Sequence, residues 1–336
     1  MADHQDVQAV LFDKIKELLP PHTSIVDEVA DILSISTDGV YRRLRSETPL
    51  RLDETNLLCQ HFRISMDEIL HETNSQSLVF QPSGMRESNL DFETYLQELL
   101  HTFGGLLKMN VKESLFSAKD IPVFHLYQYP ELVLFKMFFW RSTIFGDPDL
   151  AGQRFSLEIE NEKQERCISL CRQIAEKYSL IPTTEIWNEE TSFSFLKQIG
   201  YYYDSGLFAQ KSDAIKLIEK VEELFGHLKL EAELGYKFLS GHQPQNRVEN
   251  FKLYYNDLIL IDNVISVETE QFTRTFLIYN SIEYLSTTNP DFARRVRDWL
   301  ENIMRKSDLI STYSERMRNK FFLKIQDKVD DLKASL

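Results

Sequence analysis

The stretch from Ser36 to Arg45, STDGVYRRLR, carries the side chains of this chain best suited to binding nucleic acid. Arg42, Arg43 and Arg45 follow Tyr41 within a few positions. A guanidinium group can donate paired hydrogen bonds to a guanine edge or to a phosphate. These residue types therefore indicate contact with the bases and the backbone of DNA.

Helical spacing divides the same stretch into two faces. Val40 and Leu44 are one turn apart, which predicts a stripe that faces the core. The other side carries polar residues at helical spacing, namely Asp38, Tyr41, Arg42 and Arg45. We therefore expect a short helix with one buried face and one face free to read DNA.

Neighbouring elements must position this helix. A helix over Ser24–Ile35 is expected directly before it, with Ser24 as its N-cap, a turn at Ser34 and Ile35, and Ser36 as the cap of the second helix. Apolar periodicity predicts two more helices, over Val7–Leu19 and Leu52–Phe62. The capping box Ser65–Glu68 predicts the start of a last short helix. The first seventy-one residues thus predict five short helices.

This pattern resembles the DNA-binding domain of phage-repressor-like regulators, the XRE-type helix-turn-helix proteins. The resemblance covers about a fifth of the chain and is carried by Ala30, Leu33, Ile35, Ser36 and Val40, with the later segment LDETNLLCQHFRISMDEIL. Two positions depart from the family pattern. Ser34 stands where the turn usually has Gly, and Arg43 stands where an apolar residue is usual, so that Leu44 takes over the packing.

The resemblance implies roles for seven residues. Thr37, Asp38, Tyr41 and Arg42 would face base edges in the major groove, while Ser36, Arg43 and Arg45 would lie nearer to phosphates. Arg42 is our first choice for specificity, because arginine to guanine is the commonest specific contact. The alternative is that the arginines form an ordinary solvated helix face.

The composition limits how such a protein could bind DNA. Its 336 residues suggest two domains, and 38 Lys and Arg against 52 Asp and Glu give a net charge of −14. Binding to phosphates must therefore be local.

The sequence also indicates a compartment. The three cysteines do not show the spacing of a secreted, disulfide-bonded protein, and neither a signal peptide nor a membrane-spanning stretch is visible. We therefore expect a cytoplasmic protein with free thiols.

Residues 72–89 are rich in polar residues, Pro and Gly, and we interpret them as a linker between domains 1–71 and 90–336. The larger domain is expected to be mainly α, with one small β-hairpin near 258–279. Its helices are predicted at Leu90–Leu107, Glu160–Tyr178, Thr191–Tyr203, Ser212–Leu239, Pro290–Lys306 and Thr312–Leu332.

Other candidate sites in the larger domain favour structural interpretations. Cys167 and Cys171 lack the partners of a metal site, and the SxxK motif at Ser194–Lys197 lacks its companion motifs. The basic residues between Arg294 and Lys324 suit a solvated helix pair better than a second contact with DNA or an acidic partner. With no glycine-rich nucleotide motif, we expect no enzyme, metal or cofactor.

The aromatic stretch Phe124–Trp140 and the run Tyr201–Tyr203 suit a protein core, or a pocket for a peptide or a small apolar ligand. The leading hypothesis is a bacterial transcriptional regulator that binds double-stranded DNA as a homodimer, with a C-terminal domain that dimerises or senses a signal. The alternatives are a peptide- or small-ligand-responsive receptor and an interaction scaffold that does not bind DNA.

Overall fold

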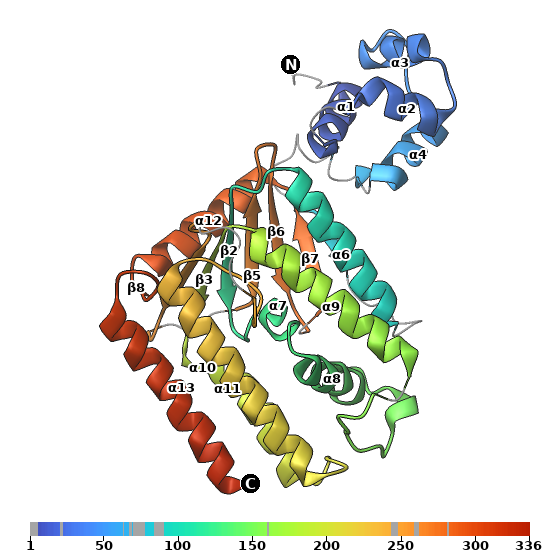
Figure 1. Ribbon diagram of the computed structural model, residues 1–336. Coiled ribbons are helices and arrows are strands. Elements are labelled where there is room, and N and C mark those ends of the chain that lie inside the picture. The colour runs from blue at the N-terminus through green and yellow to red at the C-terminus, as the bar shows by residue number, and fades with distance from the viewer. Residues whose placement is uncertain are drawn as a thin grey trace.

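The computed structural model describes residues 6–20, 23–62, 64–66, 69, 78–83, 91–159, 161–242, 248–258, 262–280 and 282–336. A small helical N-terminal domain stands at one end of a larger domain in which helices cover a β-sheet (Figure 1).

The N-terminal domain contains four helices in the described residues, which are α1 (Val7–Leu18), α2 (Ile25–Leu33), α3 (Thr37–Leu44) and α4 (Leu52–Phe62). The side chains of Asp6, Ser24 and Ser36 accept hydrogen bonds from the first turns of α1, α2 and α3. The expected capping box of the fifth helix includes Asp67 and Glu68, which lie outside the described residues, whereas Met66 and Ile69 are helical.

The α2–α3 turn bends at Ser34, which adopts the left-handed conformation with φ 53° and ψ 44°. The Ile35 N–H donates to the Ala30 carbonyl and closes the end of α2. Ser34 therefore occupies the turn position at which the family pattern has glycine. Its Cβ raises the conformational energy of this left-handed backbone.

The larger domain contains an eight-stranded mixed sheet, so the expectation of a mainly helical domain with one small hairpin is wrong. The strand order is β1-β7-β6-β5-β2-β3-β4-β8. The strands are β1 (Gln81–Ser83), β2 (Glu113–Ala118), β3 (Thr183–Trp187), β4 (Phe251–Tyr255), β5 (Val264–Glu268), β6 (Thr273–Ile278), β7 (Tyr284–Thr287) and β8 (Asp308–Leu309). The expected hairpin is present as the β5–β6 pair within this sheet.

The sheet has a parallel and an antiparallel half. Strands β2, β3 and β4 are parallel neighbours, while β5, β6, β7 and β1 follow on one side as antiparallel strands. Helical segments connect the parallel strands, as parallel pairing requires. The sequence prediction missed β2, β3 and β4 because they are short and their partners are distant along the chain.

Helices cover the sheet unevenly. Helix α12 (Pro290–Met304) packs on one face, where Leu115, Ile186 and Leu300 share a small core. The main core lies on the other face, under α6 (Phe92–Lys108), α7 (Val123–Leu126), α8 (Pro130–Phe139), α9 (Glu162–Leu180), α10 (Glu189–Asp204), α11 (Lys211–Leu234) and α13 (Glu315–Ser335). Six of these helices correspond to the predicted ones, counting α12.

Residues in the expected linker belong to the sheet. Strand β1 pairs with β7, with Pro82 opposite Leu285. Directly before it, the ring of Phe80 packs edge-on against Phe292 of α12, with centroids 5.3 Å apart. The described part of this segment is therefore an edge strand of the larger domain. None of the described helices is long and apolar enough to cross a bilayer.

Replacing Ser34 by Gly should stabilise the N-terminal domain by about 0.5–1 kcal/mol, because glycine reaches positive φ without a Cβ clash but loses more entropy on folding. Ser34→Ala keeps the clash and should give no gain. Native-state hydrogen exchange of the α2 and α3 peptides measures the difference. Equal protection in all three proteins would contradict strain at this turn.

Candidate nucleic-acid interface and the interior of the larger domain

Helix α3 has the two faces expected from its sequence. Val40 is fully buried, and Leu44 packs against the same core. Five of the predicted residues fall on one arc of the helix and are exposed, namely Thr37, Asp38, Tyr41, Arg42 and Arg45. The side chain of Ser36 lies at the start of the helix, where it accepts from the Gly39 N–H over 3.3 Å.

The charges on this arc are open to solvent. Arg42 is exposed, and no acidic side chain in the described part of the chain lies within ion-pair distance of it. Arg45 is 3.5 Å from Glu47, and the two side chains are 61% and 48% exposed. An ion pair so exposed is weak. Both guanidinium groups are therefore available to an incoming phosphate or base.

Arg43 points in a different direction from the other arginines. Its Nη2 and Nε lie 2.8 and 3.1 Å from the two carboxylate oxygens of Glu54 on α4, and Nη1 donates to the Gly39 carbonyl. Both side chains of the pair are only 14% exposed. Burial disfavours the Glu54 carboxylate, but the hydrogen bonds from Arg43 and from the Arg51 amide outweigh it and lower its pKa.

The Arg43–Glu54 pair holds α3 against α4. A phosphate contact by Arg43, as the family pattern implied, would require breaking this half-buried bidentate pair. In this structure Arg43 contributes to the packing of the domain, and its expected contact with the backbone of DNA stays a prediction. The pair also explains how a charged residue fits where the family has an apolar one.

Gln8 is a positioning residue that sequence reasoning missed. Its side-chain amide donates to the carbonyls of Arg43 and Thr48, over 2.7 and 3.0 Å, and accepts from the Leu50 N–H. These bonds tie α1 to the loop that follows α3. No spacing signal could reveal them, because the partners are more than thirty positions away.

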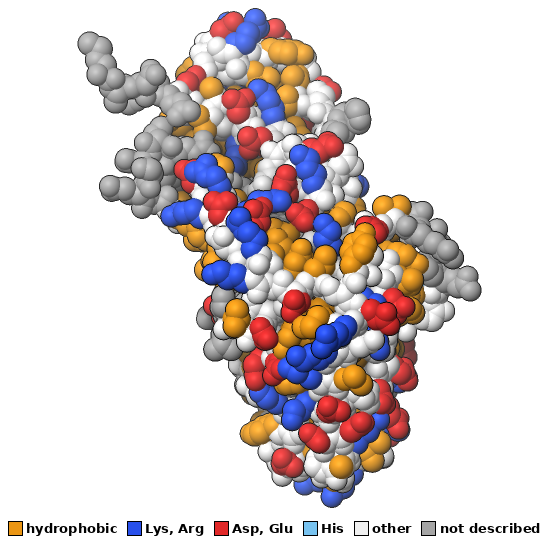
Figure 2. All heavy atoms as spheres, turned by 90° about the vertical axis from the view of Figure 1, so that its left-hand side faces the viewer, with side chains coloured by type: hydrophobic (Ala, Val, Ile, Leu, Met, Phe, Trp, Pro, Cys, Tyr) orange, Lys and Arg blue, Asp and Glu red, His pale blue; other side chains and the backbone are white. Residues whose placement is uncertain are grey.

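Several residues of the second basic stretch are held in ion pairs. Arg297 on α12 pairs with Glu113, Glu268 and Glu301, and Lys324 on α13 pairs with Glu189. Figure 2 views the molecule from the side of α12 and α13 and shows blue and red side chains interspersed there. This favours the predicted solvated helix pair over a second surface for DNA.

A network of buried charged groups lies beneath the parallel half of the sheet. Glu185 on β3 is fully buried, and its carboxylate is 2.8 Å from both His125 Nε2 and Trp187 Nε1 and accepts from the Tyr178 hydroxyl. Burial disfavours its charged form, but attraction and hydrogen bonding by His125, the Tyr178 hydroxyl and Lys237 outweigh burial and lower the pKa of Glu185.

Glu231 on α11 continues the network. Its Oε1 accepts from the Phe238 N–H over 2.8 Å and lies 3.3 Å from His227 Nε2. Burial disfavours the charged form of His227, but Glu231 outweighs it and raises the pKa. Lys237 is also buried, donates to Thr183 over 2.6 Å, and has its pKa lowered to about 7 by desolvation.

The buried network joins helices α7, α9 and α11 to strand β3. Its carboxylates are almost wholly buried, and their hydrogen bonds fix how these helices pack against the strand. Within the described residues, no group of three His, Cys, Asp or Glu side chains is placed to hold a metal ion.

The remaining candidate groups of the larger domain are structural. Cys167 and Cys171 are free and fully buried, and burial raises the pKa of Cys167 to about 11 and that of Cys171 further. Ser194 donates to the Thr191 carbonyl, while Lys197 pairs with Glu190. No thiolate or serine–lysine nucleophile is formed in these positions.

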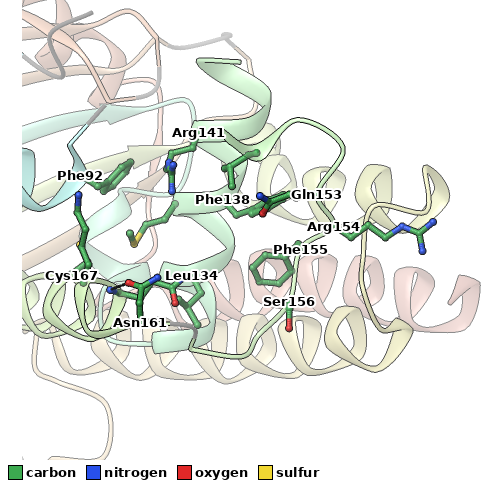
Figure 3. A pocket seen from close by; sticks show the side chains of 14 residues that line it. Phe92, Leu134, Phe138, Arg141, Gln153, Arg154, Phe155, Ser156, Asn161 and Cys167 are labelled. Carbon is green, nitrogen blue, oxygen red and sulfur yellow. Dashed lines mark hydrogen bonds between the residues drawn. The ribbon is translucent and has the colours of Figure 1, made fainter. Parts of the chain in front are cut away.

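A polar-rimmed cavity of about 280 Å³ lies beyond the end of α8 (Figure 3). Its walls include Phe92, Phe138 and Phe155, and the π-helical turn Trp140–Ile144 places Arg141 at its rim. Arg141 is paired with Asp147, over 2.8 Å from Nε to Oδ2, and Arg154 points away from the cavity. The cavity thus lacks an uncompensated charge directed inward.

A second cavity, of about 100 Å³, is almost wholly apolar and lies between α6 and the antiparallel half of the sheet. Phe124, from the aromatic stretch expected to form either a core or a pocket, lines it. Most of that stretch is core instead, as Phe135 and Trp140 show by their burial. Tyr202 is likewise buried, whereas Tyr201 is 60% exposed.

No protein-family model, curated protein or solved structure matches the chain.

Replacing Glu185 by Gln should lower the free energy of unfolding at pH 7 by about 3–5 kcal/mol, because it removes one partner of a buried charged network. The pKa of Glu185 is lowered in the folded protein, so its contribution is present above its ordinary pKa and is lost as the pH falls through the folded value. The difference in the free energy of unfolding between the wild type and the variant, the deficit of the variant, should accordingly be smaller at acid pH.

Urea unfolding at pH 7, 5 and 3 measures this deficit. Glu190→Gln, at an exposed position on the neighbouring α10, is the matched control and should remain close to the wild type. A deficit that stays constant from pH 7 to 3 would show that the charge of Glu185 does not stabilise the fold.

Proposed function

We propose that this protein is a sequence-specific DNA-binding transcriptional regulator. The observation that supports the proposal best is the exposed arc of α3, where Thr37, Asp38, Tyr41, Arg42 and Arg45 share one side of a helix whose other side is buried. A helix that follows a tight turn and presents such side chains suits the major groove.

The chemistry of the arc suits base recognition. Arg42 can donate two hydrogen bonds to a guanine edge, and the Tyr41 ring can contact a thymine methyl group. Arg45 and the exposed Arg51 supply positive charge for phosphates. Since the whole chain carries a net charge of −14, binding away from this surface is opposed.

One such domain offers few phosphate contacts, so the regulator is proposed to act as a homodimer on a palindrome. Two recognition helices would then enter major grooves about 34–36 Å apart. The larger domain supplies dimerisation or signal sensing, and a cytoplasmic bacterial protein is the setting that fits this activity.

The test begins with genomic DNA fragments captured by the full-length protein, from which a preferred duplex is derived. Arg42→Ala should weaken binding to that duplex by about 1–3 kcal/mol, because one bidentate base contact is lost, and should relax preference at one base pair. Gel-shift titrations at two salt concentrations measure both effects.

Arg154→Ala, which removes an exposed arginine of the larger domain, is the control and should bind like the wild type. Arg43→Ala should instead reduce the stability of the N-terminal domain, since it frees Glu54. The proposal is refuted if no duplex is enriched, or if Arg42→Ala binds the enriched duplex as tightly as the wild type.

A further inference from the structure

The apolar cavity beneath α6 has the walls of a ligand site. They come from seven separate elements, α6, β2, α7, α9, β5, β6 and β7, and include Leu99, Phe103 and Leu106 on α6, Tyr178 on α9, Ile265 on β5 and Ile278 on β6. Several of these side chains are only partly buried although they belong to the apolar interior. The space between them is therefore reachable from solvent.

The lining selects against charged ligands. No Lys, Arg, His, Asp or Glu side chain is among the described residues that line the cavity. Three of its hydroxyl groups have partners, since Tyr95 donates to the Ile282 carbonyl, Thr102 to the Glu98 carbonyl and Tyr178 to Glu185. A nucleotide, a phosphosugar or a charged peptide would lose its hydration there without compensation.

The size of the cavity sets the scale of its occupant. A dry engineered cavity of about 150 Å³, lined by similar side chains, binds benzene. A cavity of about 100 Å³ with an open side suits one aromatic ring or a short alkyl chain. Water would find too few polar partners in it to compete well.

Helix α6 forms a wall that can yield. Gly104 and Gly105 lie between Phe103 and Leu106, in the middle of the helix. A Cβ at Gly105 would meet no atom within 4 Å, and one at Gly104 would meet only Lys177 Nζ at 3.9 Å. Close packing therefore does not require these glycines, and they weaken the helix beside the cavity.

The same wall reaches the N-terminal domain. A polar cavity of about 180 Å³ lies at the boundary between the two domains, and three residues, Thr102, Phe276 and Tyr284, line both it and the apolar cavity. Its opposite side is formed by residues of the N-terminal domain that include Leu18 and Phe62. A displacement of α6 would thus alter the surface on which that domain rests.

We propose that the cavity beneath α6 binds a small uncharged apolar molecule, and that its occupancy changes DNA binding through Thr102, Phe276 and Tyr284. The proposed binding of an apolar molecule does not depend on the proposed function, whereas its proposed effect on DNA binding rests on that function. The energy for the change comes from the difference in ligand affinity between two placements of α6.

The binding test uses toluene and 1-octanol as probes with the full-length protein. Calorimetry and the thermal midpoint should show saturable binding to the wild type. Ile265→Phe and Ile278→Phe fill the cavity and should each weaken binding by about tenfold or more. Ile215→Phe places the same change on an exposed position of α11 and should bind within about twofold of the wild type.

Circular dichroism and the thermal midpoint without probe establish that each filled variant is folded, and either variant alone suffices for the comparison. The site is disproved by the absence of saturable binding of both probes, or by unchanged binding in a folded Phe variant.

The coupling test measures affinity for the enriched duplex with and without saturating probe. A change of about fivefold or more in the wild type, absent in Ile278→Phe, supports coupling. If the affinity for the duplex is the same with and without bound probe, the coupling is disproved but the cavity site is not. A protein that binds the probe but never binds DNA refutes the proposed function and leaves the cavity site intact.

Discussion

The larger domain depends on pairing one buried carboxylate. Glu185 lies on β3, the middle of the three parallel strands, and has no exposed surface, so its charge is tolerable only if neighbouring groups supply donors and positive charge. His125 and Tyr178 do so from α7 and α9, and both helices must sit where their side chains reach β3. The sheet and its helical layer are thereby held in one register.

This network also borders the apolar cavity. The ring of Tyr178 is one wall of the cavity, while its hydroxyl faces Glu185. Lys237 Nζ lies 3.8 Å from the centre of the same ring, a cation–π contact in a desolvated place. The part of the lining formed by Tyr178 is thus fixed by the buried charges, whereas the neighbouring helix α6, whose Phe103 ring lies edge-on to Tyr178, contains the two glycines. A ligand in the cavity would displace α6 more easily than Tyr178.

The N-terminal domain has a small core that is supported by polar contacts between its helices. Eleven of its described residues form a buried core, and a domain of about sixty residues buries too little surface to be very stable. Arg43 and Gln8 add polar ties between α3, α4 and α1. Because these ties engage the side of α3 that includes Arg43, they leave the arc of Arg42 and Arg45 free.

Sequence periodicity predicted most helices of both domains, though not α7 and α8, and both faces of α3, because these features depend on residues a few positions apart. It failed for β3, whose sequence TTEIW shows neither alternation nor an apolar run although all five residues are buried. Thr183 and Glu185 are acceptable there only through partners from other elements. The pairing of Arg43 with Glu54 escaped prediction for the same reason, since Glu54 is eleven positions away.

The charge distribution explains why a dimer suits the proposed function. Three exposed arginines on one N-terminal domain, Arg42, Arg45 and Arg51, release few counterions from DNA, and non-specific binding by such a domain is weak at physiological salt. The acidic remainder of the chain weakens it further. Two copies on adjacent grooves double the contacts, and the second copy binds at a high effective concentration. A displacement of α6 that alters the distance between the two copies of α3 would then remove the affinity gained by dimeric binding. The structure of α3 itself would stay the same.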